Sequence, residues 1–126
     1  MSARQHTARS HTMLTDRKEQ ERAIRNIAQY LATDKGKETY RQTYKEELAS
    51  WIDEFTKQGD DAQTARYQAR GNAVASAMDD VSFFAGNDGG DIDFYDWQCN
   101  RIDARIWARC KDADKIEKRL RAVVFR

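Results

Sequence analysis

Two neighbouring segments of the chain carry complementary stripes of side chains at helical spacing. The first stripe is bulky and the second is small: Tyr40, Tyr44, Leu48, Trp51 and Phe55, followed by Ala62, Ala69, Ala73 and Ala77. Residues that recur every three or four positions lie on one face of an α-helix. Because small residues let two helices approach closely and large ones fill the space between them, the stripes predict two helices packed together with Trp51 in the core.

The composition favours a helical core built from alanine and aromatic side chains. Leu, Ile, Val and Phe supply only 20 of the 126 residues, Ala supplies 17, and the chain has no proline. So few large aliphatic residues would suggest disorder in a chain of high net charge. Here 22 basic and 21 acidic residues leave a net charge of only +1, so we expect the chain to fold.

We predict an all-α fold, namely a single-domain bundle of about four helices with a long C-terminal helix and a flexible N-terminal tail. A chain of 126 residues has room for one domain of ordinary size. The polar and basic tail covers residues 1–15, and the domain covers residues 16–126. The helices are expected at about residues 16–33, 37–58, 61–85 and 91–124.

The last predicted helix carries a heptad pattern. One heptad position is taken by Cys99, Ile106, Ala113 and Leu120, and the other by Tyr95, Ile102, Arg109, Ile116 and Val123. At about 1.5 Å per residue this helix would be roughly 50 Å long, so it either projects beyond the bundle or bends near Lys111 and Asp112. If it projects, Ile116, Leu120 and Val123 form an association seam for a second copy of the chain or for another protein.

Charge is segregated along the second half of the chain. Residues 79–96 hold six acidic residues and no basic one, whereas residues 97–126 hold nine basic and four acidic residues. The acidic residues predict an acidic interaction pole around a glycine-rich loop: Asp79, Asp80, Asp88, Asp91, Asp93 and Asp96. The basic residues predict a basic interaction face on the last helix: Arg101, Arg105, Lys111, Lys115, Lys118, Arg119 and Arg121.

The acidic loop admits three interpretations. It is a solvated connection between two helices, a surface for a basic protein, or a cation site. The last follows because the stretch resembles an EF-hand calcium loop with Ala85 first, Asn87 third, Gly90 sixth and Asp96 twelfth. Ala85 replaces the opening carboxylate and Asp96 the usual glutamate, so calcium should bind no tighter than roughly millimolar.

The side-chain inventory argues against an enzyme and against a bound cofactor or metal. The two histidines, His6 and His11, both lie in the predicted tail, which leaves the body without a histidine for triads or zinc sites. No phosphate-binding glycine loop or nucleophile elbow occurs. The one route to an enzyme is Mg²⁺ held by Asp91, Asp93 and Asp96, without a partner motif for phosphate.

The lengths of the apolar segments and the spacing of the cysteines predict the cellular compartment. No run approaches the roughly 18 residues of a membrane span, so no membrane partner is expected. Cys99 and Cys110 would lie on one helix face about 16 Å apart, too far for a disulfide, as suits reduced cysteines in the cytoplasm.

Together these features predict a small non-catalytic interaction protein of the inhibitor, adaptor or assembly-factor kind, a kind common among phage and mobile-element proteins. It would dock on a protein partner through the acidic pole and the basic face. Nucleic-acid binding by the basic C-terminal helix and tail is the alternative. Cation binding by the acidic loop comes third.

Overall fold

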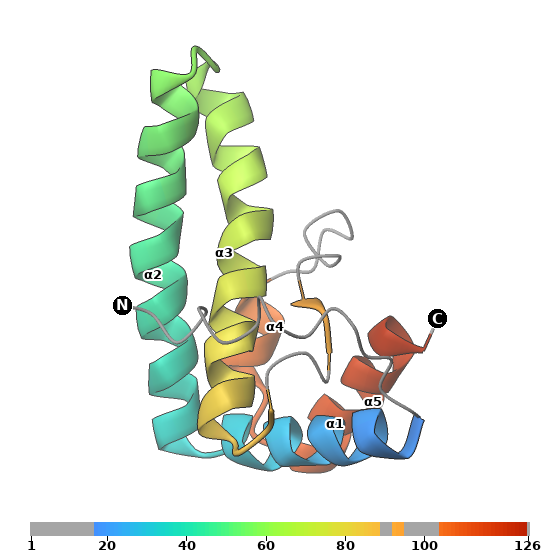
Figure 1. Cartoon of the computed structure of the whole chain (residues 1–126). Coiled ribbons are helices and arrows are strands. Elements are labelled where there is room, and N and C mark those ends of the chain that lie inside the picture. The colour runs from blue at the N-terminus through green and yellow to red at the C-terminus, as the bar shows by residue number, and fades with distance from the viewer. Residues whose placement is uncertain (1–16, 89–91, 95–103, 126) are drawn as a thin grey trace.

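The computed structural model describes residues 17–88, 92–94 and 104–125 (Figure 1). Within these ranges the chain forms five α-helices and no strand, which confirms the all-α prediction for this part of the chain. The helices are α1 (Arg17–Leu31), α2 (Asp34–Lys57), α3 (Ala62–Phe84), α4 (Ala104–Arg109) and α5 (Ala113–Val124). The predicted tail at residues 1–15 lies outside the described ranges. None of the helices in these ranges is long and apolar enough to cross a membrane.

The two longest helices, α2 and α3, form an antiparallel hairpin (Figure 1). Thr43 Oγ1 donates to Asp80 Oδ2 (2.8 Å) and Ser76 Oγ donates to Glu47 Oε1 (3.3 Å). The residues joined on α2, Thr43 and Glu47, are four positions apart, and their partners on α3 are four positions apart in the reverse order. The two bonds therefore fix the register of the antiparallel helices. Three residues of the predicted small stripe are buried on α3, namely Ala69, Ala73 and Ala77, whereas Ala62 is exposed and Ala65 is buried in its place.

The turn at the tip of the hairpin follows from local chemistry. Gly59 adopts a φ of 102°, a left-handed conformation that side chains disfavour. The carboxylate of Asp61 then accepts from the backbone N–H of Thr64 (2.8 Å) and starts α3. The distal half of the hairpin extends beyond the other helices (Figure 1).

Trp51 lies outside the main core, so its predicted core position is wrong. The buried cluster takes Tyr40 from α2, with Tyr44 packed against it, and begins at Val74 on α3. Farther out, Leu48, Trp51, Ile52 and Phe55 are only half-buried, and the Trp51 ring stacks on Phe55 with 5.5 Å between ring centroids. Alanines on one neighbouring helix are too small to enclose an indole ring.

A tight corner turns α1 across the base of the hairpin (Figure 1). Thr33 caps α2 by accepting from the backbone N–H of Gly36 (3.0 Å), and its hydroxyl donates to Tyr30 O (2.6 Å). A Cβ on Gly36 would lie 1.9 Å from Tyr30 O, so only glycine fits where the two helices meet. The cap starts α2 at Asp34, three residues before the predicted start.

The predicted single helix over residues 91–124 is wrong, because residues 110–112 are not helical. Asp112 ends the continuity by accepting from the backbone N–H groups of Asp114 (2.9 Å) and Lys115 (3.4 Å), which caps a new helix. Cys110 therefore lies in the break rather than on a helix face, and Cys99 is outside the described ranges.

The break lets α5 pack alongside α1, which also overturns the predicted association seam. Ile116 and Leu120 are fully buried within the chain, and Val123 packs partly buried against the same cluster. They belong to the same buried cluster as the apolar stripe of α1, namely Ala23, Ile24, Ile27, Ala28 and Leu31. The sequence left two possibilities, a last helix that projects beyond the bundle and one that bends near Lys111 and Asp112. The structure has the bend.

The two tryptophans in the described ranges should differ in their contribution to stability. Trp107 on α4 is 1% exposed and belongs to the main core. Trp107→Ala should lower the free energy of unfolding by about 3 to 5 kcal/mol. Trp51→Ala should lower it by only about 1 to 2 kcal/mol, because part of the ring is already in water. Urea unfolding followed by circular dichroism measures both, and equal losses would contradict this description of the core.

Candidate functional site

The structure contradicts the predicted acidic pole at two of its six residues. Asp79 and Asp80 are buried on α3, where Asp80 accepts from Thr43 in the contact with α2. Asp88 and Asp93 are exposed, whereas Asp91 and Asp96 lie outside the described ranges. The prediction of six surface carboxylates is therefore wrong for the two that belong to the hairpin.

Asn87, which the EF-hand resemblance placed among the calcium ligands, joins α1 to the end of α3 instead. Its Oδ1 accepts from Asn26 Nδ2 (2.9 Å), and its Nδ2 donates to Ala23 O and to Ser82 Oγ (both 3.1 Å). The side chain is buried by these partners. Across the described ranges, no three His, Cys, Asp or Glu residues lie close enough to hold a metal ion. Gly90 and Asp96 lie outside those ranges.

Most of the predicted basic face is present on the surface. Arg105, Lys111, Lys115, Lys118 and Arg119 are exposed. Arg101 lies outside the described ranges. Arg121 departs from the prediction, because it is half-buried and makes ion pairs within the chain.

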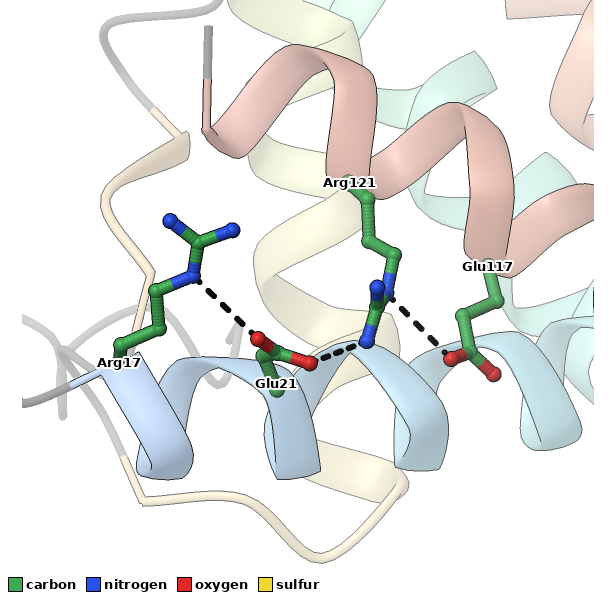
Figure 2. Close-up of polar contacts among 4 residues, drawn as sticks. All are labelled: Arg17, Glu21, Glu117 and Arg121. Atoms are coloured by element: carbon green, nitrogen blue, oxygen red, sulfur yellow. Dashed lines mark hydrogen bonds and ion pairs between the residues drawn. The ribbon is translucent and has the colours of Figure 1, made fainter.

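Arg121 is the centre of a network that joins α1 to α5 (Figure 2). Its Nη2 contacts Glu21 Oε1 on α1, and its Nε lies 3.5 Å from Glu117 Oε2 on α5. Glu21 also pairs with Arg17, whose Nε lies 3.3 Å from Glu21 Oε2. The guanidinium of Arg17, the first residue of α1, lies 3.9 Å from the centre of the ring of Phe125, the residue after α5. The start of α1 therefore meets the end of α5, and the two helices run antiparallel.

The antiparallel pair creates a basic surface that the sequence did not reveal. Two exposed acidic residues, Glu19 and Asp114, lie on these helices. Six basic residues are also exposed there: Lys18, Arg22 and Arg25 on α1, and Lys115, Lys118 and Arg119 on α5. We call these six residues the α1–α5 surface. The spacing of Lys18, Arg22 and Arg25, opposite the apolar stripe, is the signal that could have added α1 to the basic face.

Internal ion pairs leave this surface with a positive field. The two glutamates at the seam, Glu21 and Glu117, both pair with Arg121 and are half-buried. Asp114 is the exposed acidic residue of α5. It lies in the first turn of the helix, where its negative charge interacts favourably with the helix dipole. Several like charges on adjacent helices raise the local concentration of a negatively charged partner.

The placement of α4 and α5 relative to α1 depends on Lys37. This side chain is buried, and its Nζ donates to Leu31 O at the end of α1 (2.9 Å) and to Cys110 O just after α4. Burial lowers the pKa of Lys37 from its ordinary value of 10.5. A cation at the C-terminal carbonyls of two helices also meets the negative ends of their dipoles.

Comparison with known proteins finds no match: no family model, no curated protein and no solved structure resembles this chain.

Replacing Lys37 should weaken the junction of α1, α2 and α4. Lys37→Met should lower the free energy of unfolding by about 1 to 3 kcal/mol, because two carbonyls lose a charged donor. Lys35→Met is the matched control, since Lys35 is exposed to solvent. It should change stability by no more than about 0.5 kcal/mol. Denaturant unfolding near neutral pH measures both variants.

The pH dependence gives a second readout. The folded protein has a lowered pKa at Lys37, so between that pKa and 10.5 the unfolded chain binds more protons there than the folded chain does. Stability rises with pH wherever the unfolded state binds more protons. The stability of the wild type relative to Lys37→Met should therefore grow as the pH rises through this window. A difference that stays flat or shrinks would show that the ammonium group is not desolvated.

Proposed function

We propose that this chain is a non-catalytic interaction protein that docks on the acidic surface of a protein partner through the α1–α5 surface. The observation that carries the proposal is the exposure of six Lys and Arg side chains on two adjacent helices, while the seam glutamates are paired internally. Complementary charge steers association and selects among partners. An inhibitor, adaptor or assembly factor acts by binding its partner and needs no catalytic group.

The proposal changes one half of the docking mode predicted from the sequence. With Asp79 and Asp80 buried, these two residues do not contribute to a docking surface, and the proposal is made for the basic residues alone. With α1 added, the basic face becomes broader than one helix. We also propose that residues 16–126 act as one domain in the cytoplasm, because the buried cluster draws residues from α1, α2, α3, α4 and α5.

Nucleic-acid binding is the second candidate for the same surface. Three of its six residues are arginines, which pair with phosphate groups in a bidentate manner. The surface contains no aromatic residue to stack on a base, so this mode would rest on phosphate contacts and depend strongly on salt.

Charge reversal tests the proposal. Arg22→Glu combined with Lys118→Glu reverses one exposed charge on each helix without touching the network around Arg121. The variant should bind poly-L-glutamate, a probe for an acidic protein surface, at least about ten-fold more weakly than the wild type near physiological salt. A control that combines Arg41→Glu and Lys45→Glu reverses two exposed charges on α2 and should stay within about two-fold of the wild type.

A double-stranded oligonucleotide serves as the second probe in the same assay. Tighter binding of the oligonucleotide than of poly-L-glutamate, lost on the same charge reversal, would favour the second candidate. Equal binding of both probes by wild type, charge-reversed variant and control would contradict both candidates for this surface.

A further inference from the structure

The distal half of the α2–α3 hairpin carries an apolar stripe that its two helices cover only in part. Leu48, Ile52 and Phe55 lie on one side of α2, because they follow one another at intervals of four and three residues. All three side chains are half-buried, and none belongs to the main buried cluster. The stripe therefore lies where the hairpin extends beyond the other helices (Figure 1).

The same side of α2 is covered nearer the base of the hairpin. Lys37, Arg41 and Lys45 precede Leu48 on this side at intervals of four, four and three residues. The ammonium group of Lys37 donates to Cys110 O just after α4, and α4 contacts α2. A further helix that lay along the stripe would therefore continue the layer that α4 begins.

The antiparallel geometry places two arginines of α3 on the side of the hairpin that carries the stripe. Leu48 follows by one position Glu47, which meets α3 through a hydrogen bond. Arg66 and Arg70 each follow by one position an alanine that is buried in the hairpin. A two-fold axis perpendicular to the pair relates antiparallel helices, so positions one residue after the contact positions lie on the same side of both. Arg66 and Arg70 therefore border the stripe from α3.

The charges that border the stripe are basic. Four exposed residues contribute them: Arg41, Lys45, Arg66 and Arg70. Acidic residues of the same part of α2 lie elsewhere, since Glu46 precedes the contact position Glu47 and Asp53 pairs with Lys57 (2.9 Å). Residues 62–78 of α3 contain no acidic residue. We call the three apolar and four basic residues the distal face.

The combination of an apolar stripe with basic borders selects among occupants. A second copy of the chain would bring the four basic residues of each copy together in a two-fold contact, which like charges oppose. A nucleic acid would use the basic residues through its phosphates and leave the apolar stripe without a partner. An amphipathic helix with acidic residues on both edges of its apolar side matches both parts of the distal face.

We infer that the distal face binds an acidic amphipathic helix of a protein partner. The apolar side of that helix would pack on Leu48, Ile52 and Phe55, and its carboxylates would meet the lysine and arginines at the borders. It would complete a three-helix layer with α2 and α3, since helices bury an apolar stripe best against two neighbours. The inference does not rest on the proposed function, because the α1–α5 surface belongs to other helices.

A designed peptide tests the apolar part of the distal face. The labelled peptide has leucines at intervals of three and four residues and glutamates on both edges of that stripe, and fluorescence anisotropy measures its binding. The wild type should bind it, and Ile52→Gln should weaken binding at least about five-fold, because an apolar contact is lost. Ser50→Gln is the matched control on an exposed position of α2 outside the stripe, and it should stay within about two-fold.

Charge reversal tests the basic borders and separates the two surfaces. Lys45→Glu combined with Arg70→Glu reverses one border charge on each helix and should weaken peptide binding about ten-fold. The same variant should bind poly-L-glutamate within about two-fold of the wild type, because that probe has no apolar side. Arg22→Glu combined with Lys118→Glu should show the reverse pattern. Circular dichroism checks that each variant is folded.

Two further peptides test the chemistry of the occupant. A peptide of the same composition in scrambled order, and one with lysine in place of each glutamate, should both bind at least about ten-fold more weakly. No binding of the acidic peptide by the wild type at about 100 μM would overturn the inference. Equal binding of the scrambled peptide, or unchanged binding by both Ile52→Gln and the border charge reversal, would also overturn it.

The remaining outcomes would assign the distal face to another occupant. Displacement of the peptide by a double-stranded oligonucleotide, lost on the border charge reversal, would overturn the inference in favour of nucleic acid. A dimer in sedimentation equilibrium that dissociates with Ile52→Gln but not with Ser50→Gln would overturn it in favour of a second copy of the chain.

Discussion

The buried ammonium group of Lys37 holds three helices of this protein at one point. Moving a charged group out of water is costly unless it is paired with strong acceptors. Here the carbonyls of Leu31 and Cys110 provide them, at the end of α1 and just beyond α4. Gly36, next to Lys37, allows the backbones of α1 and α2 to touch. This junction fixes the angle at which α1 leaves the hairpin.

The position of α1 then determines where α5 can lie. The apolar stripe of α1 faces Ile116 and Leu120, and the network around Arg121 joins the exposed edges of the two helices (Figure 2). Because Glu21 and Glu117 are paired within the seam, the exposed lysines and arginines of the two helices outnumber the exposed acidic residues, Glu19 and Asp114. The same packing that buries the last helix therefore also produces the basic surface that we propose as the docking site.

Helix periodicity and the turn residues between segments predicted the first three helices to within a few residues at each end. The prediction of one helix over residues 91–124 failed, because the heptad pattern continues across Asp112, where the structure has the N-cap of a new helix. The acid at Asp112 followed by Asp114 and Lys115 is a helix start that competes with the heptad, and burial of Ile116 against α1 decides between them. Charge counting failed for Asp79 and Asp80 because both are buried on α3, where Asp80 accepts from Thr43 of α2.

Other features depend on contacts between distant residues, which no local pattern contains. The burial of Lys37 requires Cys110, and the pairing of Glu21 with Arg121 joins residues one hundred positions apart. Half-burial of Trp51 depends on how far the hairpin extends beyond the core.

Chemical-shift mapping tests most directly that α1 and α5 present one docking surface. In a titration of ¹⁵N-labelled protein with poly-L-glutamate, the largest shifts of backbone amide signals should fall between Lys18 and Arg25 and between Lys115 and Arg119. The hairpin from Trp51 to Arg70 should change little. Shifts that are largest on the hairpin, or that affect α5 without α1, would contradict a shared surface built by the packing of these two helices.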